Sequence, residues 1–148
     1  MKIQSIALTL FTLALAIVPL QAHEKGRTVA GPNGGRILEK VEPRAEFFVT
    51  ADRKVQITFL DKANKPVAPA EQVVAVTVGQ RISPTKLAFE KSGNSFLSTT
   101  ALPSGNDYPA VVQIKPTASG KTTTERFTLD TTKCGECKLG EYACICAH

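Results

Sequence analysis

Residues 54–60 read Lys-Val-Gln-Ile-Thr-Phe-Leu. Val55, Ile57 and Phe59 alternate with polar side chains, so a β-strand would place these three apolar residues together on one face. A second strand-like stretch, Ala-Glu-Phe-Phe-Val-Thr, precedes it at residues 45–50. The three residues between the two stretches are few enough for a hairpin loop. This part of the chain therefore predicts an antiparallel β-hairpin with one buried face.

The rest of the chain continues the pattern of short strand-like stretches separated by Gly, Pro, Asn and Asp. Further stretches lie at residues 36–41, 73–78, 86–90, 95–99, 110–115 and 123–129. The stretch at 73–78, Val-Val-Ala-Val-Thr-Val, is apolar and β-branched enough to predict a buried strand. Because no helical period interrupts this series, we expect an all-β fold. The candidates are a single antiparallel β-sandwich of immunoglobulin-like shape and a small barrel.

Residues 1–22 have the features of a secretory signal peptide. Lys2 supplies the positive charge, the apolar run from Ile6 to Val18 is short for a membrane span, and Ala22 is a small residue at the expected cut. We therefore expect a periplasmic or secreted protein. Membrane contact is expected only if the signal peptide stays uncleaved.

The predicted organisation has four parts. They are a signal peptide at 1–22, a flexible lead-in at 23–35, a β-sandwich at 36–130 and an irregular Cys-rich tail at 131–148. The sandwich contains neither Cys nor His, so its serines have no nearby imidazole to activate them, and we expect no enzyme activity. The net charge is +5, but the basic residues are scattered and Trp is absent, so no nucleic-acid partner is expected.

All four cysteines of the chain lie in the stretch CGECKLGEYACICAH, residues 134–148. A Cys-x-x-Cys turn can direct both sulfurs at one metal ion, and an extended Cys-x-Cys places both side chains on one side of a strand. The spacer of six residues between the pairs is long enough to bring them together. Four thiolates suit tetrahedral Zn²⁺ or soft Cu(I). The predicted ligands are Cys134, Cys137, Cys144 and Cys146, with His148 as an auxiliary ligand.

The other histidine, His23, becomes the N-terminal residue if cleavage follows Ala22. An N-terminal His can chelate a transition metal, typically Cu(II), through its α-amine and its ring nitrogen. His23 is therefore a further metal candidate. The alternative is an ordinary surface histidine beside Glu24 and Lys25.

Two other interpretations of the tail stay open. Exported cysteines usually pair, and four cysteines allow three connectivities, so the chain could be a structural or interaction module with a disulfide-stapled tail. Cys-x-x-Cys and Cys-x-Cys also occur in thiol–disulfide exchange, although no thioredoxin-like βαβ pattern surrounds them here. A metal site is favoured because all the cysteines follow the last predicted strand, where a disulfide would constrain only a tail.

Three consecutive stretches also form a recognisable pattern. They are Gly-Pro-Asn-Gly-Gly-Arg-Ile-Leu at 31–38, Glu-Phe-Phe-Val at 46–49 and Val-Gln-Ile-Thr-Phe-Leu-Asp-Lys-Ala-Asn-Lys-Pro-Val at 55–67. This pattern resembles the small β domain of periplasmic adaptor subunits in heavy-metal efflux pumps of the resistance-nodulation-division class. Asn33 stands where such domains often have His, and the long α-hairpin of an adaptor has no counterpart here.

The resemblance implies metal handling in the cell envelope, with a metal-efflux component as the partner. It identifies no ligand within the sandwich. Together with the cysteine spacing, it predicts an exported metal-binding accessory protein that sequesters or delivers Zn²⁺ or Cu(I).

Overall fold

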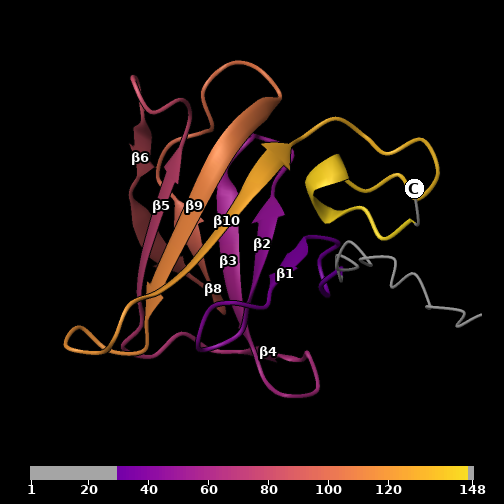
Figure 1. Ribbon diagram of the computed structural model, residues 1–148. Helices are drawn as coiled ribbons and strands as arrows, with labels where there is room; N and C mark the ends of the chain where they lie inside the picture. The colour runs from indigo at the N-terminus through magenta and orange to yellow at the C-terminus, as the bar shows by residue number, and fades with distance from the viewer. Residues whose placement is uncertain (1–29, 147–148) are drawn as a thin grey trace, which may run out of the picture.

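The computed structural model describes residues 30–146, which form two antiparallel β-sheets around a shared core (Figure 1). The predicted signal peptide, most of the predicted lead-in, His23 and His148 lie outside these residues. The described residues contain no helix with the length and apolar character of a membrane span.

The larger sheet has six strands in the order β1-β2-β3-β8-β7, and β4 pairs with β3 beside this path. Its strands are β1 (Arg36–Leu38), β2 (Ala45–Val49), β3 (Val55–Leu60), β4 (Pro66–Val67), β7 (Phe89–Ser92) and β8 (Ser95–Ser98). Figure 1 shows β1 and β2 on the side of the sheet that faces the C-terminal segment.

The smaller sheet has four strands in the order β10-β9-β5-β6. Its strands are β5 (Val73–Val78), β6 (Thr85–Leu87), β9 (Asp107–Lys115) and β10 (Thr123–Asp130). The prediction of an all-β antiparallel fold is confirmed. Within residues 30–146 neither sheet closes on itself, so the two-sheet, sandwich-like arrangement holds and the small barrel does not.

The hairpin predicted from the sequence forms between β2 and β3, with Val49 opposite Val55. Its loop turns at Arg53, which has a left-handed φ of 62°. Ile57 and Phe59 are fully buried along with Val55, so the alternation identified the inner face correctly.

Three predicted strands differ from the structure. The stretch at 36–41 is a strand only as far as Leu38, where β1 ends. The stretch at 73–78 is not buried throughout: Val76 and Val78 face the core, whereas Val73 is 44% exposed, because β5 covers the core with one face only. The stretch at 86–90 is not one strand. The chain passes at Ala88 from β6 in the smaller sheet to β7 in the larger sheet.

The core lies between the sheets and draws side chains from both. Phe47 of β2 meets Phe127 of β10 edge to face, with ring centroids 5.2 Å apart. At the margin, the Arg36 guanidinium of β1 lies 3.3 Å from the Glu125 carboxylate of β10, which is almost fully buried. Apolar packing and one ion pair therefore join the two layers.

The turn at Gly31–Gly35 is held by a buried carboxylate. Glu46 of β2 is fully buried and accepts hydrogen bonds from the backbone N–H groups of Asn33, at 2.9 Å, and Gly35, at 2.8 Å. The Asn33 side-chain amide donates a third, at 2.7 Å. A Cβ at Gly31 would lie 2.4 Å from Glu46 Cδ, so only glycine permits this close approach.

Candidate metal centre

The Cys-rich segment, residues 131–146, folds back against the larger sheet. Its single turn of 3₁₀-helix, η1 (Glu141–Ala143), contributes Tyr142 and Ala143 to the core cluster. The Tyr142 ring meets Phe47 edge to face at a centroid distance of 5.9 Å. Figure 1 shows the segment turning back beside β1 and β2. The premise that a cross-link here would constrain only a tail is therefore wrong, because the segment is part of the core packing.

A tight turn carries the first cysteine pair. The Cys134 N–H donates to the Leu139 carbonyl at 2.8 Å, and the Lys138 N–H donates back to the Cys134 carbonyl at 3.1 Å. Lys138 has a φ of 62°, in the left-handed region that reverses the chain. An isolated bridge between Lys133 and Gly140 closes the base of the turn. This turn places the Cys137 sulfur on the same side as the Cys134 sulfur.

The second pair follows η1 directly. The Cys144 N–H donates to the Glu141 carbonyl at 3.2 Å, and Cys144 itself is extended, with φ −62° and ψ 131°. The extended backbone carries the chain on to Cys146 beside the first pair. Because Tyr142 and Ala143 are buried just before Cys144, core packing fixes where this pair begins.

The four sulfur atoms form one cluster. All Sγ atoms lie within 4.8 Å of one another. The Cys134–Cys144, Cys137–Cys144 and Cys134–Cys146 separations are 3.1, 3.8 and 3.9 Å. A tetrahedron with Zn–S bonds of about 2.3 Å has edges of about 3.8 Å. A disulfide bond is only about 2.05 Å long, and all four thiols are free in this structure. The cluster is therefore close enough to hold a metal ion.

The surroundings of the four sulfurs differ. Cys134 is buried at 1% exposure, whereas the other three cysteines are half-buried. One side of the cluster therefore rests on the protein and the other faces solvent. This exposure leaves a path by which an ion could enter or leave.

Hydrogen bonding separates the acidities of the thiols. The Leu139 N–H, followed by the Ile145 N–H, lowers the pKa of Cys137 to about 7. The pKa of Cys144 is raised, mainly by its contact with Cys134. Partial removal from water, and then the Glu136 side chain, raises the pKa of Cys146. Of these three thiols, Cys137 is thus the one that ionises most readily near neutral pH.

The structure assembles Cys134, Cys137, Cys144 and Cys146 as the sequence predicted, whereas His148 and His23 fall outside the described residues. Sequence reasoning missed Tyr142, which fixes the cluster to β2. The sequence feature that could have pointed to Tyr142 was the presence of an aromatic residue in the six-residue spacer between the two cysteine pairs. The chain has only two tyrosines.

Comparisons with protein-family models, with curated proteins and with solved structures found no match to this chain. The assignment of the site therefore rests on the residues and their geometry.

Proposed function

We propose that this protein is an exported metal-binding accessory protein that sequesters or delivers one Zn²⁺ or Cu(I) ion. The observation that carries the proposal is the convergence of four Sγ atoms within 4.8 Å. Thiolates are the preferred protein ligands of these metals. Of the two, we favour Zn²⁺, because it is commonly held by four cysteines.

The role in transfer rests on the exposure of the site. Three of the four cysteines are half-buried, so an acceptor protein can approach the ion from the solvent side. The partner we propose is a metal-efflux component of the cell envelope. Support for that partner comes from the resemblance of residues 31–78 to adaptor β domains, and support for export comes from residues 1–22.

The test begins with protein expressed from the full-length sequence and purified without oxygen. We expect one metal ion per chain by elemental mass spectrometry, four thiols that react only after the metal is removed, and cleavage after Ala22 by N-terminal sequencing. Replacing bound metal with Co²⁺ gives an optical spectrum that reports four-coordinate thiolate ligation.

Two variants separate the ligands. Cys134→Ser/Cys137→Ser should abolish stoichiometric binding, whereas His148→Ala should leave stoichiometry intact and weaken affinity if the imidazole assists. Retention of full stoichiometry by the double cysteine variant would refute the ligand set. Four oxidised cysteines in freshly isolated protein, with no metal uptake after reduction, would favour the disulfide-stapled module. Reduction of a model disulfide would favour thiol–disulfide exchange.

A further inference from the structure

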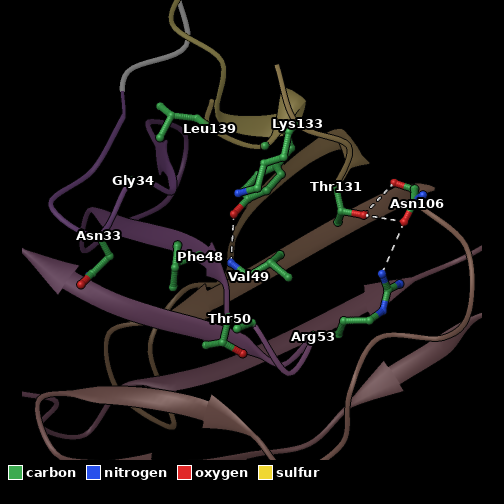
Figure 2. A pocket seen from close by; sticks show the side chains of 13 residues that line it. Asn33, Gly34, Phe48, Val49, Thr50, Arg53, Asn106, Thr131, Lys133 and Leu139 are labelled. Atoms are coloured by element: carbon green, nitrogen blue, oxygen red, sulfur yellow. Dashed lines mark hydrogen bonds between the residues drawn. The ribbon is translucent and has the colours of Figure 1, made fainter. Parts of the chain in front are cut away.

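A pocket of about 480 Å³ lies between the Cys-rich segment and the β2–β3 hairpin. Lys133, Leu139 and Gly140 of the Cys-rich segment form one wall, and Val49 and Arg53 belong to the opposite one. Figure 2 shows Lys133 and Leu139 on the side of the Cys-rich segment, and Phe48, Val49, Thr50 and Arg53 on the side of the hairpin. The volume suits a small organic molecule.

The charged groups that line the pocket are all positive. Lys133 and Arg53 are its two charged residues, and no Asp or Glu is among the lining residues. Two acids lie outside the lining: Asp52 accepts a hydrogen bond from Thr50 Oγ1, and the buried Glu46 carboxylate accepts hydrogen bonds from Asn33 and Gly35. Within residues 30–146 the Lys133 ammonium has no hydrogen-bond or ion-pair partner.

Arg53 is held in place by its contacts. Its Nη2 donates to the Pro103 carbonyl at 2.8 Å and to the Gly105 carbonyl at 2.6 Å. Its Nη1 reaches Asn106 Oδ1 at 3.4 Å, and Thr131 Oγ1 donates to the same oxygen at 3.2 Å (Figure 2). The Asn106 oxygen is thus occupied, which leaves its NH₂ group as a donor. Carbonyl contacts do not neutralise the guanidinium, so this side of the pocket keeps its positive charge.

Both walls of the pocket also carry apolar side chains. Phe48, Val49, Leu139 and the Tyr142 ring contribute carbon surface, and the Tyr142 hydroxyl is already bonded to the Val49 N–H. A pocket with an apolar part and two cations fits a ligand that has a hydrocarbon body and an anionic head. A carboxylate accepts charge-assisted hydrogen bonds from an ammonium such as that of Lys133, and the charge of Arg53 also favours an anion in the pocket.

We propose that this pocket binds a carboxylate attached to an apolar group, either a free small organic acid or the C-terminal residue of a peptide. The Lys133 ammonium contacts the carboxylate, the Arg53 guanidinium adds positive charge to the pocket, and the apolar part rests on Leu139 and Phe48. The site uses none of the four cysteines as a contact. Their role is indirect, because Lys133 and Leu139 flank the Cys134–Cys137 turn.

The pocket is therefore expected to depend on the metal site, a step that rests on the proposed function. An ion shared by four thiolates would fix the turn between Lys133 and Gly140 and so complete one wall. Without the ion, this wall is held by the hydrogen bonds of the turn and by the packing of Tyr142 and Ala143. We expect carboxylate binding to be tighter in the metal-loaded protein than in the metal-free protein.

The probe is 4-phenylbutyrate, with 4-phenylbutanol and 4-phenylbutylamine as neutral and cationic analogues. Binding to the zinc-loaded protein is followed by chemical-shift changes of backbone amides around the pocket. We expect only the acid to bind, and Lys133→Met to weaken it about tenfold, as for the loss of one charge-assisted hydrogen bond. Lys121→Met, in the β9–β10 connection, makes the same charge change outside the pocket and should have no effect. Equal binding of acid and amine, or unchanged binding by Lys133→Met, would overturn the proposal.

A second arm identifies the source of the carboxylate. An acetylated tripeptide ending in Phe is compared with its C-terminal amide. Tighter binding of the peptide acid than of 4-phenylbutyrate assigns the site to peptide C-termini, and the reverse assigns it to free acids. Failure of both acids to bind would overturn the proposal.

A third arm repeats the titration on metal-free protein prepared by acidification and desalting under reducing conditions. Carboxylate chelators are avoided because they would compete for the pocket. Weaker binding supports the coupling, and equal binding refutes the coupling alone. If no metal binds to the protein at all, the proposed function fails. The effect of Lys133→Met on binding of the acid still tests whether the pocket binds carboxylates.

Discussion

The Tyr142 hydroxyl accepts a hydrogen bond of 2.9 Å from the Val49 N–H, and so joins the Cys-rich segment to a strand 93 positions earlier. The same ring packs against Phe47 in the core. Burial raises the pKa of Tyr142, which keeps the hydroxyl neutral over the physiological range. The Cys-rich segment and the core of the sandwich therefore share one side chain.

Substitution of Tyr142 should damage both stability and metal affinity. We expect Tyr142→Phe to lower the free energy of unfolding by about 1 kcal/mol, because the Val49 N–H loses its partner. Tyr142→Ala should cost about 3–5 kcal/mol, because it also leaves a cavity beside Phe47. Urea unfolding and a competitive zinc titration measure the two effects. Normal zinc affinity in a folded Tyr142→Ala protein would show that the cluster forms independently of the core.

Cys137 and Cys146 of the metal-free, reduced protein should react at different pH values. Hydrogen bonds from Leu139 and Ile145 lower the pKa of Cys137 to about 7, whereas the pKa of Cys146 is raised. Alkylation by iodoacetamide, resolved by peptide mass spectrometry, should therefore reach half its maximal rate near pH 7 at Cys137 and at a much higher pH at Cys146. The two cysteines should give the same pH profile once the protein is unfolded in urea. Identical profiles in the folded protein would contradict the hydrogen-bond assignment.

The same shift gives a pH dependence of stability in the metal-free protein. The pKa of Cys137 is lowered on folding from its ordinary value of 9.0 to about 7, so its thiolate stabilises the folded state fully above pH 9. This contribution is lost as the pH falls through about 7. Cys137→Ser should remove that part of the pH dependence in urea-unfolding curves. The range from pH 6 to pH 10 extends roughly one unit beyond the folded and unfolded pKa values of Cys137. If the stabilities of wild type and variant changed in parallel over this range, the assigned role of the Cys137 thiolate would be contradicted.

Metal should stabilise the whole fold and not only the Cys-rich segment. A ligand that binds only the folded state adds about 2.7 kcal/mol when its free concentration is 100 times its Kd. Because Tyr142 and Ala143 belong to the core cluster, we expect one thermal transition that moves to higher temperature with Zn²⁺. Cys134→Ser/Cys137→Ser should show no such increase. A separate early transition for the segment, with an unchanged main transition, would show that the two parts unfold independently.

The Gly31–Gly35 turn should be destabilised by a larger side chain at Gly31 and by loss of the charge of Glu46. Gly31→Ala places a Cβ against Glu46 Cδ and should cost about 1–3 kcal/mol. Glu46→Gln replaces one acceptor oxygen by a donor facing the three N–H donors of Asn33 and Gly35, and should cost about 2 kcal/mol. Gly135→Ala is the matched control, because nothing lies within 4 Å of its added Cβ. Equal stability of the two alanine variants in urea would contradict this account of the turn.

Local patterns predicted the strands well where one face is buried and the other is polar. The alternation of Val55, Ile57 and Phe59 identified the inner face of β3, and the Cys-x-x-Cys and Cys-x-Cys spacings identified all four residues of the sulfur cluster. Both signals depend on neighbours in the sequence. The period-2 alternation of apolar residues and the spacing of the cysteines were therefore the two sequence features that predicted the structure best.

Features that depend on distant parts of the chain were not predictable in this way. The exposure of Val73 follows from which face of β5 meets the other sheet, and the change of sheet at Ala88 follows from the packing of two layers. The position of Tyr142 against Phe47 likewise joins residues far apart in sequence. No local composition encodes these relationships, because each is decided by tertiary contacts.

The long reach of the Tyr142 contact has a consequence for the order of folding. Contacts between residues far apart in sequence form slowly, because a large loop must close before they become favourable. The surface that receives Tyr142 is built by β2, which pairs locally with β3 through a short hairpin. We therefore expect the sulfur cluster to assemble after the hairpin, so that metal capture is a late event in the maturation of the chain.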